Sequence, residues 1–291
     1  MSLPVALVEA VAAKLGQPIQ QSKSLGGGCI AHATRIETAG GPFFLKYGRG
    51  EVAETFAVEA VGLGALDEAG SPLVIPEVLT VQPENETCPG FLLLEWIEPG
   101  AKSTAFWQDF GIGLADLHRY TAERCGFEQD NFIGRLPQRN TWERSWIDFY
   151  RKHRLEPQVQ RARAGGRWQR AWDHSLSDLY HRLPDLLPEN PPASILHGDL
   201  WSGNFLVARS GTAALIDPAT YYGHREADLA MTELFGGFAD DFYEAYRAAW
   251  SLEPGYTERR DIYNLYHLIN HLNLFGGGYA GAVASILKKF G

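Results

Sequence analysis

The sequence predicts an α+β fold with two lobes, a small β-rich lobe over residues 1–97 and a larger, mostly helical lobe over residues 98–291. In the first lobe, short apolar runs alternate with turns that contain Gly and Pro, which is typical of strands. After Gly100 the apolar residues recur at helical spacing. The 291 residues are 45% apolar and 21% charged, so the chain is globular and can bury a sizeable core.

The first lobe is expected to begin with a helix that starts after Ser2 and Pro4 and ends at Gly16. A strand then leads to Gly26-Gly27-Gly28, and two further strands are separated by the turn at 38–41. The remaining elements are a helix and two strands, expected at 52–69, 76–81 and 91–96.

Two features of this lobe suggest a phosphate site. Gly26, Gly27 and Gly28 lie between strands, where glycine lets the backbone approach a phosphate closely. Lys46 lies in an apolar strand, and an unpaired ammonium there is costly. Glu59 falls on the apolar face of the next helix, so the sequence predicts an ion pair between Lys46 and Glu59 that orients the lysine toward a nucleotide.

The strand pattern breaks at Glu95-Trp96-Ile97, before Pro99 and Gly100. We interpret this segment as the hinge between the lobes. Its free backbone groups are expected to bind the edge of an adenine ring.

The second lobe reads as a series of helices. They are expected at 104–120, 142–153, 168–182, 226–235, 240–250 and 259–275. The only strands expected here flank the two loops that contain Asp199 and Asp217.

Those two loops carry the most informative motif of the chain, His-Gly-Asp-Leu-Trp-Ser-Gly-Asn at 197–204 followed by Ile-Asp-Pro at 216–218. The spacing of Asp199, Asn204 and Asp217 is that of a kinase-type phosphotransferase and predicts a bilobal, protein-kinase-like fold. Asp199 is predicted to be the catalytic base. Asn204 and Asp217 are predicted to hold Mg²⁺ on the phosphates of ATP.

Other residues near the motif receive secondary roles. We expect Trp201 to form one wall of the acceptor site. We expect Gln138, Tyr222 and His224 to contact acceptor hydroxyls. His197 is expected to be structural.

Asp228 is expected to hydrogen-bond the catalytic-loop backbone. His267 and His271 have i, i+4 spacing but no accompanying Glu, so we expect a core or substrate-edge role and not a metal site.

The net charge of −9 argues against a general nucleic-acid binder. Glu9 and Lys14 interrupt the apolar residues near the start, which argues against a signal peptide, and no apolar run suggests a membrane span. Three widely spaced cysteines fit a reducing compartment, so we expect a cytoplasmic protein. Cys29 follows the glycines, where it is either a packing residue or a redox switch over the phosphates.

The runs LHGDLWSGN, IDPATYYGHREADLAM and ELFGGF closely resemble the fructosamine kinases, also called ketosamine-3-kinases. Gly-Gly-Gly-Cys-Ile at 26–30 and the Glu-Trp-Ile hinge look like the bacterial branch, and Asp-Pro-Ala replaces the Asp-Phe-Gly of protein kinases. The resemblance implies ATP-dependent phosphorylation of the 3-hydroxyl of ketosamines, either small molecules or glycated protein lysines, as a deglycation repair.

Two alternatives remain at this stage. One is a kinase for an aminoglycoside, a choline-like alcohol or a homoserine-like alcohol. The other is a non-catalytic nucleotide-binding module. The second is disfavoured because the complete set is present: Lys46, Glu59, Asp199, Asn204 and Asp217.

Overall fold

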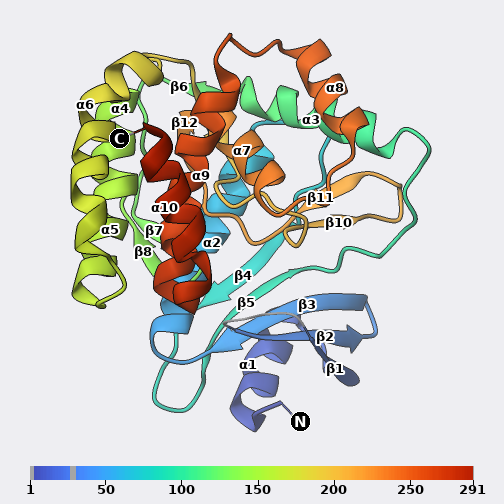
Figure 1. The fold of residues 1–291 in the computed structure, drawn as a ribbon. Helices are drawn as coiled ribbons and strands as arrows, with labels where there is room; N and C mark the ends of the chain where they lie inside the picture. Colours follow the sequence, from blue (N-terminus) through green and yellow to red (C-terminus); the bar gives the residue numbers. More distant parts are fainter. Residues whose placement is uncertain (1–2, 27–30, 291) are drawn as a thin grey trace.

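The computed structural model describes residues 3–26 and 31–290. The part near the N-terminus is an antiparallel sheet in the order β1-β2-β3-β5-β4. Its strands are β1 (Gln21–Leu25), β2 (His32–Thr38), β3 (Gly41–Gly48), β4 (Val78–Gln82) and β5 (Gly90–Glu95). As Figure 1 shows, helix α1 (Val5–Leu15) lies below this sheet and α2 (Glu51–Glu68) above it.

The central strand β5 explains this arrangement. Four consecutive apolar residues from Phe91 to Leu94 are buried, so both faces of the strand need cover. Phe91 and Leu93 pack with Leu7 of α1, while Leu92 and Leu94 pack with Phe56 of α2. A helix on each face therefore completes the core of this lobe.

The remaining two thirds of the chain is mainly helical, as predicted. Its α-helices are α3 (Phe106–His118), α4 (Trp146–Phe149), α5 (Glu156–Ala164), α6 (Asp173–Leu186), α7 (Glu226–Leu234), α8 (Asp240–Ala249), α9 (Tyr256–Phe275) and α10 (Ala280–Phe290). Short 3₁₀ turns occupy Arg170–Trp172 and Gly277–Tyr279. The chain leaves the sheet at Glu95 and enters α3 at Phe106, and 1–97 and 98–291 remain the lobes that we propose.

The expected helix at 142–153 is longer than the sequence suggested. A π-helical segment, Tyr150–Leu155, joins α4 to α5 without a break. Pro157 has no N–H to donate to the carbonyl of His153, and the Arg154 guanidinium donates to that oxygen instead at 3.1 Å. Because Arg154 is fully buried among aromatic rings, this contact is fixed by tertiary packing.

The helical lobe also contains more strands than expected. Those around the catalytic motif are β9 (Ala193–Leu196), β10 (Phe205–Val207), β11 (Ala213–Leu215) and β12 (Tyr221–His224). The sequence did not indicate β6 (Thr121–Ala122), β7 (Asn131–Ile133) or β8 (Leu136–Gln138), nor helix α10. The expectation of strands only around the two motif loops was therefore wrong, because pieces of two or three residues carry no periodic pattern.

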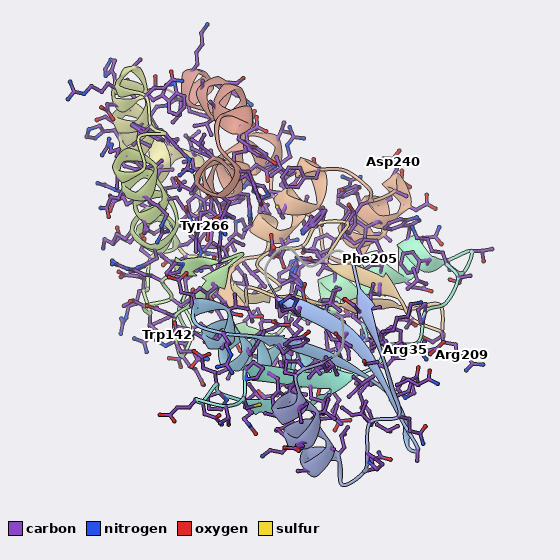
Figure 2. The ribbon with its side chains drawn as sticks, turned by 90° about the horizontal axis from the view of Figure 1, so that it is seen from below. Arg35, Trp142, Phe205, Arg209, Asp240 and Tyr266 are labelled. Carbon is purple, nitrogen blue, oxygen red and sulfur yellow. The ribbon has the colours of Figure 1, made fainter. Side chains whose placement is uncertain are left out.

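Side chains fill the space between these elements. In Figure 2, Arg35 of β2 and Arg209, which follows β10, lie toward one edge of the molecule, and Trp142 lies toward the opposite edge.

Cys88 and Cys125 are buried and unpaired. Within the described ranges, no helix is long and apolar enough to cross a membrane.

Candidate active site

The predicted ion pair is present. Lys46 lies on β3 in an apolar run, and its Nζ is 2.6 Å from Glu59 Oε1 on α2. Glu59 reaches it because Phe56 and Leu63, on the same helical face, are buried against the sheet. Lys46 Nζ also contacts Asp217 Oδ1 from the other lobe. Burial alone would lower the pKa of Lys46, but the two carboxylates outweigh it and raise the pKa, so the lysine stays charged.

The catalytic loop follows β9 and turns sharply at Gly198. This residue has φ +82°, and a Cβ there would lie 2.1 Å from the carbonyl oxygen of Ala219. Only glycine fits such a position without moving the backbone. The turn brings Asp199 out of the end of the strand, where it is partly buried.

Asp228, on α7, holds the backbone of this loop, as predicted. Its carboxylate accepts hydrogen bonds from the N–H groups of His197 at 2.7 Å and Gly198 at 2.8 Å. Behind it, His118 Nε2 lies 3.3 Å from Asp228 Oδ2, and His118 Nδ1 lies 2.9 Å from the hydroxyl of Tyr246. Since burial lowers the pKa of His118, the neutral ring donates from Nε2 to Asp228 and accepts at Nδ1.

Asn204 closes the other end of the loop. Its Nδ2 donates to the backbone oxygen of Asp199 at 2.8 Å and to Asp199 Oδ2 at 3.0 Å. No described residue donates to Asn204 Oδ1, so the amide oxygen is free to bind a cation. The same residue therefore orients the predicted base and presents a hard oxygen ligand.

Asp217 follows β11 with φ +55°, the only described non-glycine residue with a positive φ. This left-handed conformation costs free energy and persists where neighbours hold it. Here His197 Nε2 donates to the carbonyl of Ile216 at 2.9 Å. The carboxylate of Asp217 is turned toward Lys46, and its side chain remains 48% exposed. The hydrogen bond from His197 to Ile216 is the structural role that we expected for His197.

The surroundings of Asp199 shift its pKa. Burial is the largest cause that raises the pKa of Asp199 well above its usual range. The hydrogen bond from Asn204 opposes this shift, while the charges of Asp217 and Asp228 add to it. A carboxylate with a raised pKa is a stronger base, which suits a group that must accept the proton of an alcohol.

The hinge residues connect the two lobes. Ile97 is buried with Ala208 and Ala214, and Trp96 donates from Nε1 to Glu98 at 2.9 Å. No backbone hydrogen bond to another described residue uses the N–H of Trp96 or Ile97. These backbone donors are therefore available to the edge of an adenine ring. Glu95 itself is exposed, and its N–H donates to Glu77.

The glycine segment is only partly visible. Gly26 is described, and a Cβ there would meet no atom within 4 Å. Gly27, Gly28 and Cys29 lie outside the described residues.

Two of the three residues expected to contact acceptor hydroxyls, Gln138 and His224, belong to the scaffold. Gln138 is buried, with its amide bonded to Asn131, Ala219 and Tyr266. His224 is buried, with Nδ1 2.7 Å from the hydroxyl of Tyr263. Tyr222 stacks on Trp142, with ring centroids 5.9 Å apart. Because the polar atoms of Gln138 and His224 already have partners, we assign these two residues to the support of the loop and not to acceptor contacts. For Tyr222, whose hydroxyl has no partner among the described residues, the acceptor contact stays a prediction.

Trp201, by contrast, lies two residues after Asp199 on the same loop, and its backbone N–H donates to the backbone oxygen of Asp199 at 3.1 Å. Its ring lies against Gly203, where a Cβ would approach within 2.3 Å, so the glycine makes room for the indole. The ring of Trp201 neighbours that of Phe235, with centroids 6.3 Å apart. The ring of Phe235 in turn neighbours that of His271, with centroids 4.9 Å apart. This arrangement presents an aromatic wall next to Asp199.

Sequence reasoning missed two groups of residues. His118 falls on the apolar face of α3 with Phe110 and Leu114, and a histidine among buried apolar residues was the available signal. Phe235 and Phe275 were not singled out, because a single aromatic residue at a helix end gives no pattern.

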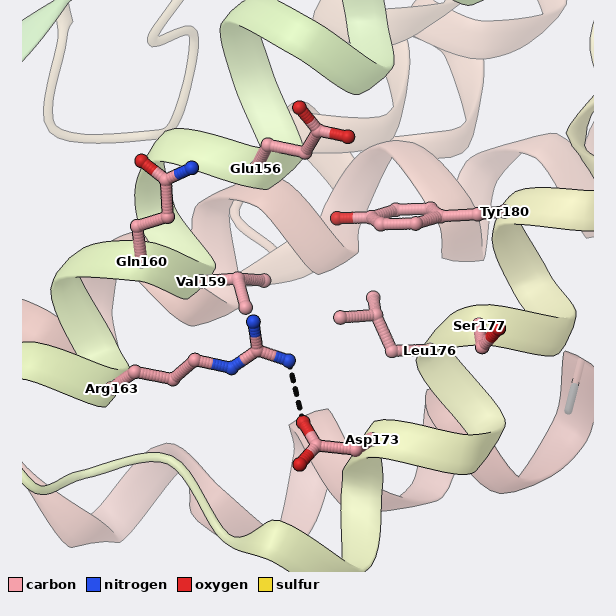
Figure 3. Close-up of a pocket in the computed structure, with 8 residues that line it drawn as sticks. All are labelled: Glu156, Val159, Gln160, Arg163, Asp173, Leu176, Ser177 and Tyr180. Carbon is pink, nitrogen blue, oxygen red and sulfur yellow. Dashed lines mark hydrogen bonds and ion pairs between the residues drawn. The ribbon is translucent and has the colours of Figure 1, made fainter.

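A hollow of about 370 Å³ lies between α5 and α6, away from these residues (Figure 3). Arg163 and Asp173 form an ion pair across its rim at 2.5 Å, and Val159, Leu176 and Tyr180 line it. None of the residues of the phosphotransfer motif lines this hollow.

The arrangement around Asp199 can carry out phosphoryl transfer. The predicted base Asp199, the amide oxygen of Asn204, the carboxylate of Asp217 and the paired Lys46 come together here. No three His, Cys, Asp or Glu side chains form a metal cluster in the described part of the chain. One carboxylate and one amide oxygen nevertheless fit Mg²⁺, which commonly takes few protein ligands and completes its shell with phosphates and water.

Comparisons with known proteins agree with this chemistry. Residues 5–290 match a family model described as fructosamine kinase. A probable ketoamine kinase of Synechocystis sp. is 37% identical, over 97% of this chain and 95% of the relative. The chloroplastic protein-ribulosamine 3-kinase of Arabidopsis thaliana is also 37% identical, over 92% of this chain and 81% of the relative.

Two solved structures are similar to this chain over nearly its whole length. A candidate fructosamine-3-kinase from Thermobifida fusca superposes with a TM-score of 0.87 at 31% identity, covering 97% of each chain. An aminoglycoside phosphotransferase solved with ADP and hygromycin B superposes with a TM-score of 0.68 at 15% identity, covering 98% of each chain, and shares the fold.

Proposed function

Because the chain belongs to the fructosamine kinase family, we propose that it phosphorylates the 3-hydroxyl of ketosamines with ATP and Mg²⁺. Membership makes it an ATP-dependent phosphotransferase that acts on an alcohol group. The observation that carries the proposal is the convergence of Asp199, Asn204 and Asp217 beside the aromatic wall that begins at Trp201.

In the proposed reaction the hydroxyl of the acceptor hydrogen-bonds to Asp199. The hydroxyl oxygen forms a bond to the γ-phosphorus of ATP as the bond from that phosphorus to the leaving oxygen of ADP breaks. The hydroxyl proton passes to the Asp199 carboxylate. Asn204 fixes the position of that carboxylate through its 3.0 Å hydrogen bond.

Lys46 and the hinge would place the nucleotide. The ammonium of Lys46 is held by Glu59 and is suited to the phosphates, and the free N–H groups of Trp96 and Ile97 are suited to the adenine. Mg²⁺ bound at Asp217 and Asn204 Oδ1 would neutralise the charge of the phosphates.

The acceptor assignment rests on the relatives, whose names specify ketoamines and ribulosamines. The acceptor is a small ketosamine or a glycated lysine of a protein, and the reaction is a step of deglycation repair. The cytoplasmic location expected from the cysteine pattern stays a prediction.

The test is a panel of ribulose, erythrulose and fructose amines, with hygromycin B beside them, incubated with ATP and Mg²⁺. We expect a 3-phosphate product by mass spectrometry and NMR for at least one ketosamine, formed about a hundredfold or more slowly by Asp199→Asn. Turnover of hygromycin B with no ketosamine product would replace the proposal with the aminoglycoside alternative.

A further inference from the structure

Aromatic side chains continue from the catalytic loop across the neighbouring surface. We call this set the aromatic strip: Trp201, Phe235, His271, Phe275 and Tyr279. Ring distances connect all of its members, with His271 at 4.9 Å from Phe235, 5.5 Å from Phe275 and 5.1 Å from Tyr279. The strip is therefore one continuous surface that begins two residues after Asp199.

The strip is unusually open to solvent. Trp201, Phe235 and Phe275 are 39%, 41% and 59% exposed, and they are the only strongly exposed Trp and Phe side chains of the described residues. Single exposed apolar residues are normal on a protein surface, but a contiguous group of large rings marks a binding surface.

The strip contains one fixed polar atom. His271 Nδ1 donates to the carbonyl oxygen of His267 at 2.8 Å, so Nε2 carries the free lone pair. Burial lowers the pKa of His271, which keeps the ring neutral. Nε2 can therefore accept a hydrogen bond from an N–H donor placed over the rings.

The chain next to two members of the strip lacks side chains that could block it. Gly236 follows Phe235, and Gly276, Gly277 and Gly278 follow Phe275. A Cβ at any of these four positions would meet no atom within 4 Å. A bulky group on the strip would therefore not collide with neighbouring side chains at these positions.

The chemistry of a ketosamine selects the occupant. Only two carbon atoms separate its nitrogen from the carbon that carries the 3-hydroxyl. When that hydroxyl lies at Asp199, the nitrogen and its substituent must leave across the adjoining surface. A protonated secondary amine offers N–H donors and a positive charge, and aromatic faces attract cations.

Resting on the proposed function, we propose that the aromatic strip binds the substituent on the amine nitrogen and favours ketosamines whose alkylamine part carries an aromatic ring. Asp199 and Trp201 contact the sugar part of the ketosamine. Phe235, Phe275 and Tyr279 contact the substituent on its nitrogen. The protein then discriminates among ketosamines by the amine as well as by the sugar.

The experiment compares two acceptors with the same sugar, the ribulose adducts of methylamine and of 2-phenylethylamine. We expect wild-type kcat/KM to be about tenfold or more higher for the phenylethyl adduct. Burying a phenyl ring contributes at least the ~1.4 kcal/mol that corresponds to a tenfold change. Phe275→Ser should bring the ratio of the two values close to one. Ile112→Ser is the control, since Ile112 is 43% exposed on α3 outside the strip and should leave the ratio unchanged.

Equal kcat/KM values for the two adducts in the wild type, or an equal loss for both in Phe275→Ser, would overturn the assignment. A thermal unfolding midpoint within about a degree of wild type shows that Phe275→Ser is folded, as its exposure leads us to expect. Failure of both adducts and of every other ketosamine of the panel to give a phosphorylated product would instead remove the proposed function, and the assignment with it.

Discussion

The two sides of Asp199 are built differently. On the side that we propose binds the nucleotide, Lys46 is held between the carboxyl groups of Glu59 and Asp217, and Asn204 bonds to Asp199 itself. On the acceptor side, the aromatic strip is exposed and holds one fixed hydrogen-bond acceptor, His271 Nε2.

The difference follows from what each side must bind. Phosphoryl transfer depends on positioning and on charges that are fixed before reaction, so the nucleotide side needs side chains held by partners. Aromatic surfaces bind through area and tolerate variation in shape. We infer that the chemistry is invariant on one side and the acceptor is selected on the other.

The largest test of this contrast separates two aspartates on the nucleotide side. Asp199→Asn should lower kcat by about a hundredfold or more and leave nucleotide affinity nearly intact, because it removes only the base. Asp217→Asn should also weaken binding of Mg²⁺ and ATP, because it removes a charged ligand. Steady-state kinetics with titration calorimetry of the nucleotide measure both. More than about a tenth of wild-type rate in Asp199→Asn would rule out its role as base.

A second test concerns the support behind the loop. His118→Leu removes the hydrogen bond to Asp228, and bonds to charged groups are worth about 1.5–3 kcal/mol, so kcat should fall about tenfold or more. The KM values for ATP and acceptor should change little, since His118 contacts neither. His118→Gln can still donate to Asp228 and should recover most of the rate.

The comparison of Leu with Gln distinguishes positioning from packing. If both variants lose kcat equally while remaining folded, the hydrogen bond to Asp228 does not position the loop. A wild-type kcat in folded His118→Leu would lead to the same conclusion.

The smallest expected effect lies under the acceptor side. His267 is buried, its Nδ1 has no hydrogen-bond partner among the described residues, and burial, with a smaller contribution from His271, lowers its pKa to about 3. In the unfolded chain the pKa is about 6.5, so the unfolded state alone takes up the proton between about pH 6.5 and 3. Stability is therefore complete above about pH 6.5 and is lost as the pH falls, by about 2 kcal/mol at pH 5 from this residue.

Denaturant unfolding at pH 7 and pH 5 measures this loss. His267→Asn cannot titrate and should lose about 2 kcal/mol less than wild type between the two values. His174→Asn is the control, because the His174 side chain is 89% exposed and should not change the difference. The same loss in His267→Asn and wild type would contradict the buried, neutral state of His267.

Much of the nucleotide side could be predicted from the chain alone. The spacing of Asp199, Asn204 and Asp217 and the order of Lys46 before Glu59 are local features, and the structure brings these residues together. The Asp228 contact with the loop was also predicted. Short polar motifs between strands specify such sites because each residue has a role set by its chemistry.

Residues on the acceptor side and in the scaffold could not be assigned in this way. Gln138 and His224 looked available for a substrate, yet tertiary contacts bury them and occupy their polar atoms. The helix expected to end at His153 continues because the distant packing of Arg154 positions it to bond the carbonyl left free by Pro157.

The sequence by itself thus determined the alternation of strands and helices, the paired lysine and the three residues of the phosphotransfer motif. Only the tertiary structure decided which polar side chains are hydrogen-bonded within the scaffold and which aromatic rings stay exposed next to one another. The reason is physical: periodicity and motifs encode local preferences, whereas burial and hydrogen-bond partners depend on segments far apart in the chain. Phe235 and Phe275 are 40 residues apart in the chain and join through His271 only when α7 and α9 pack.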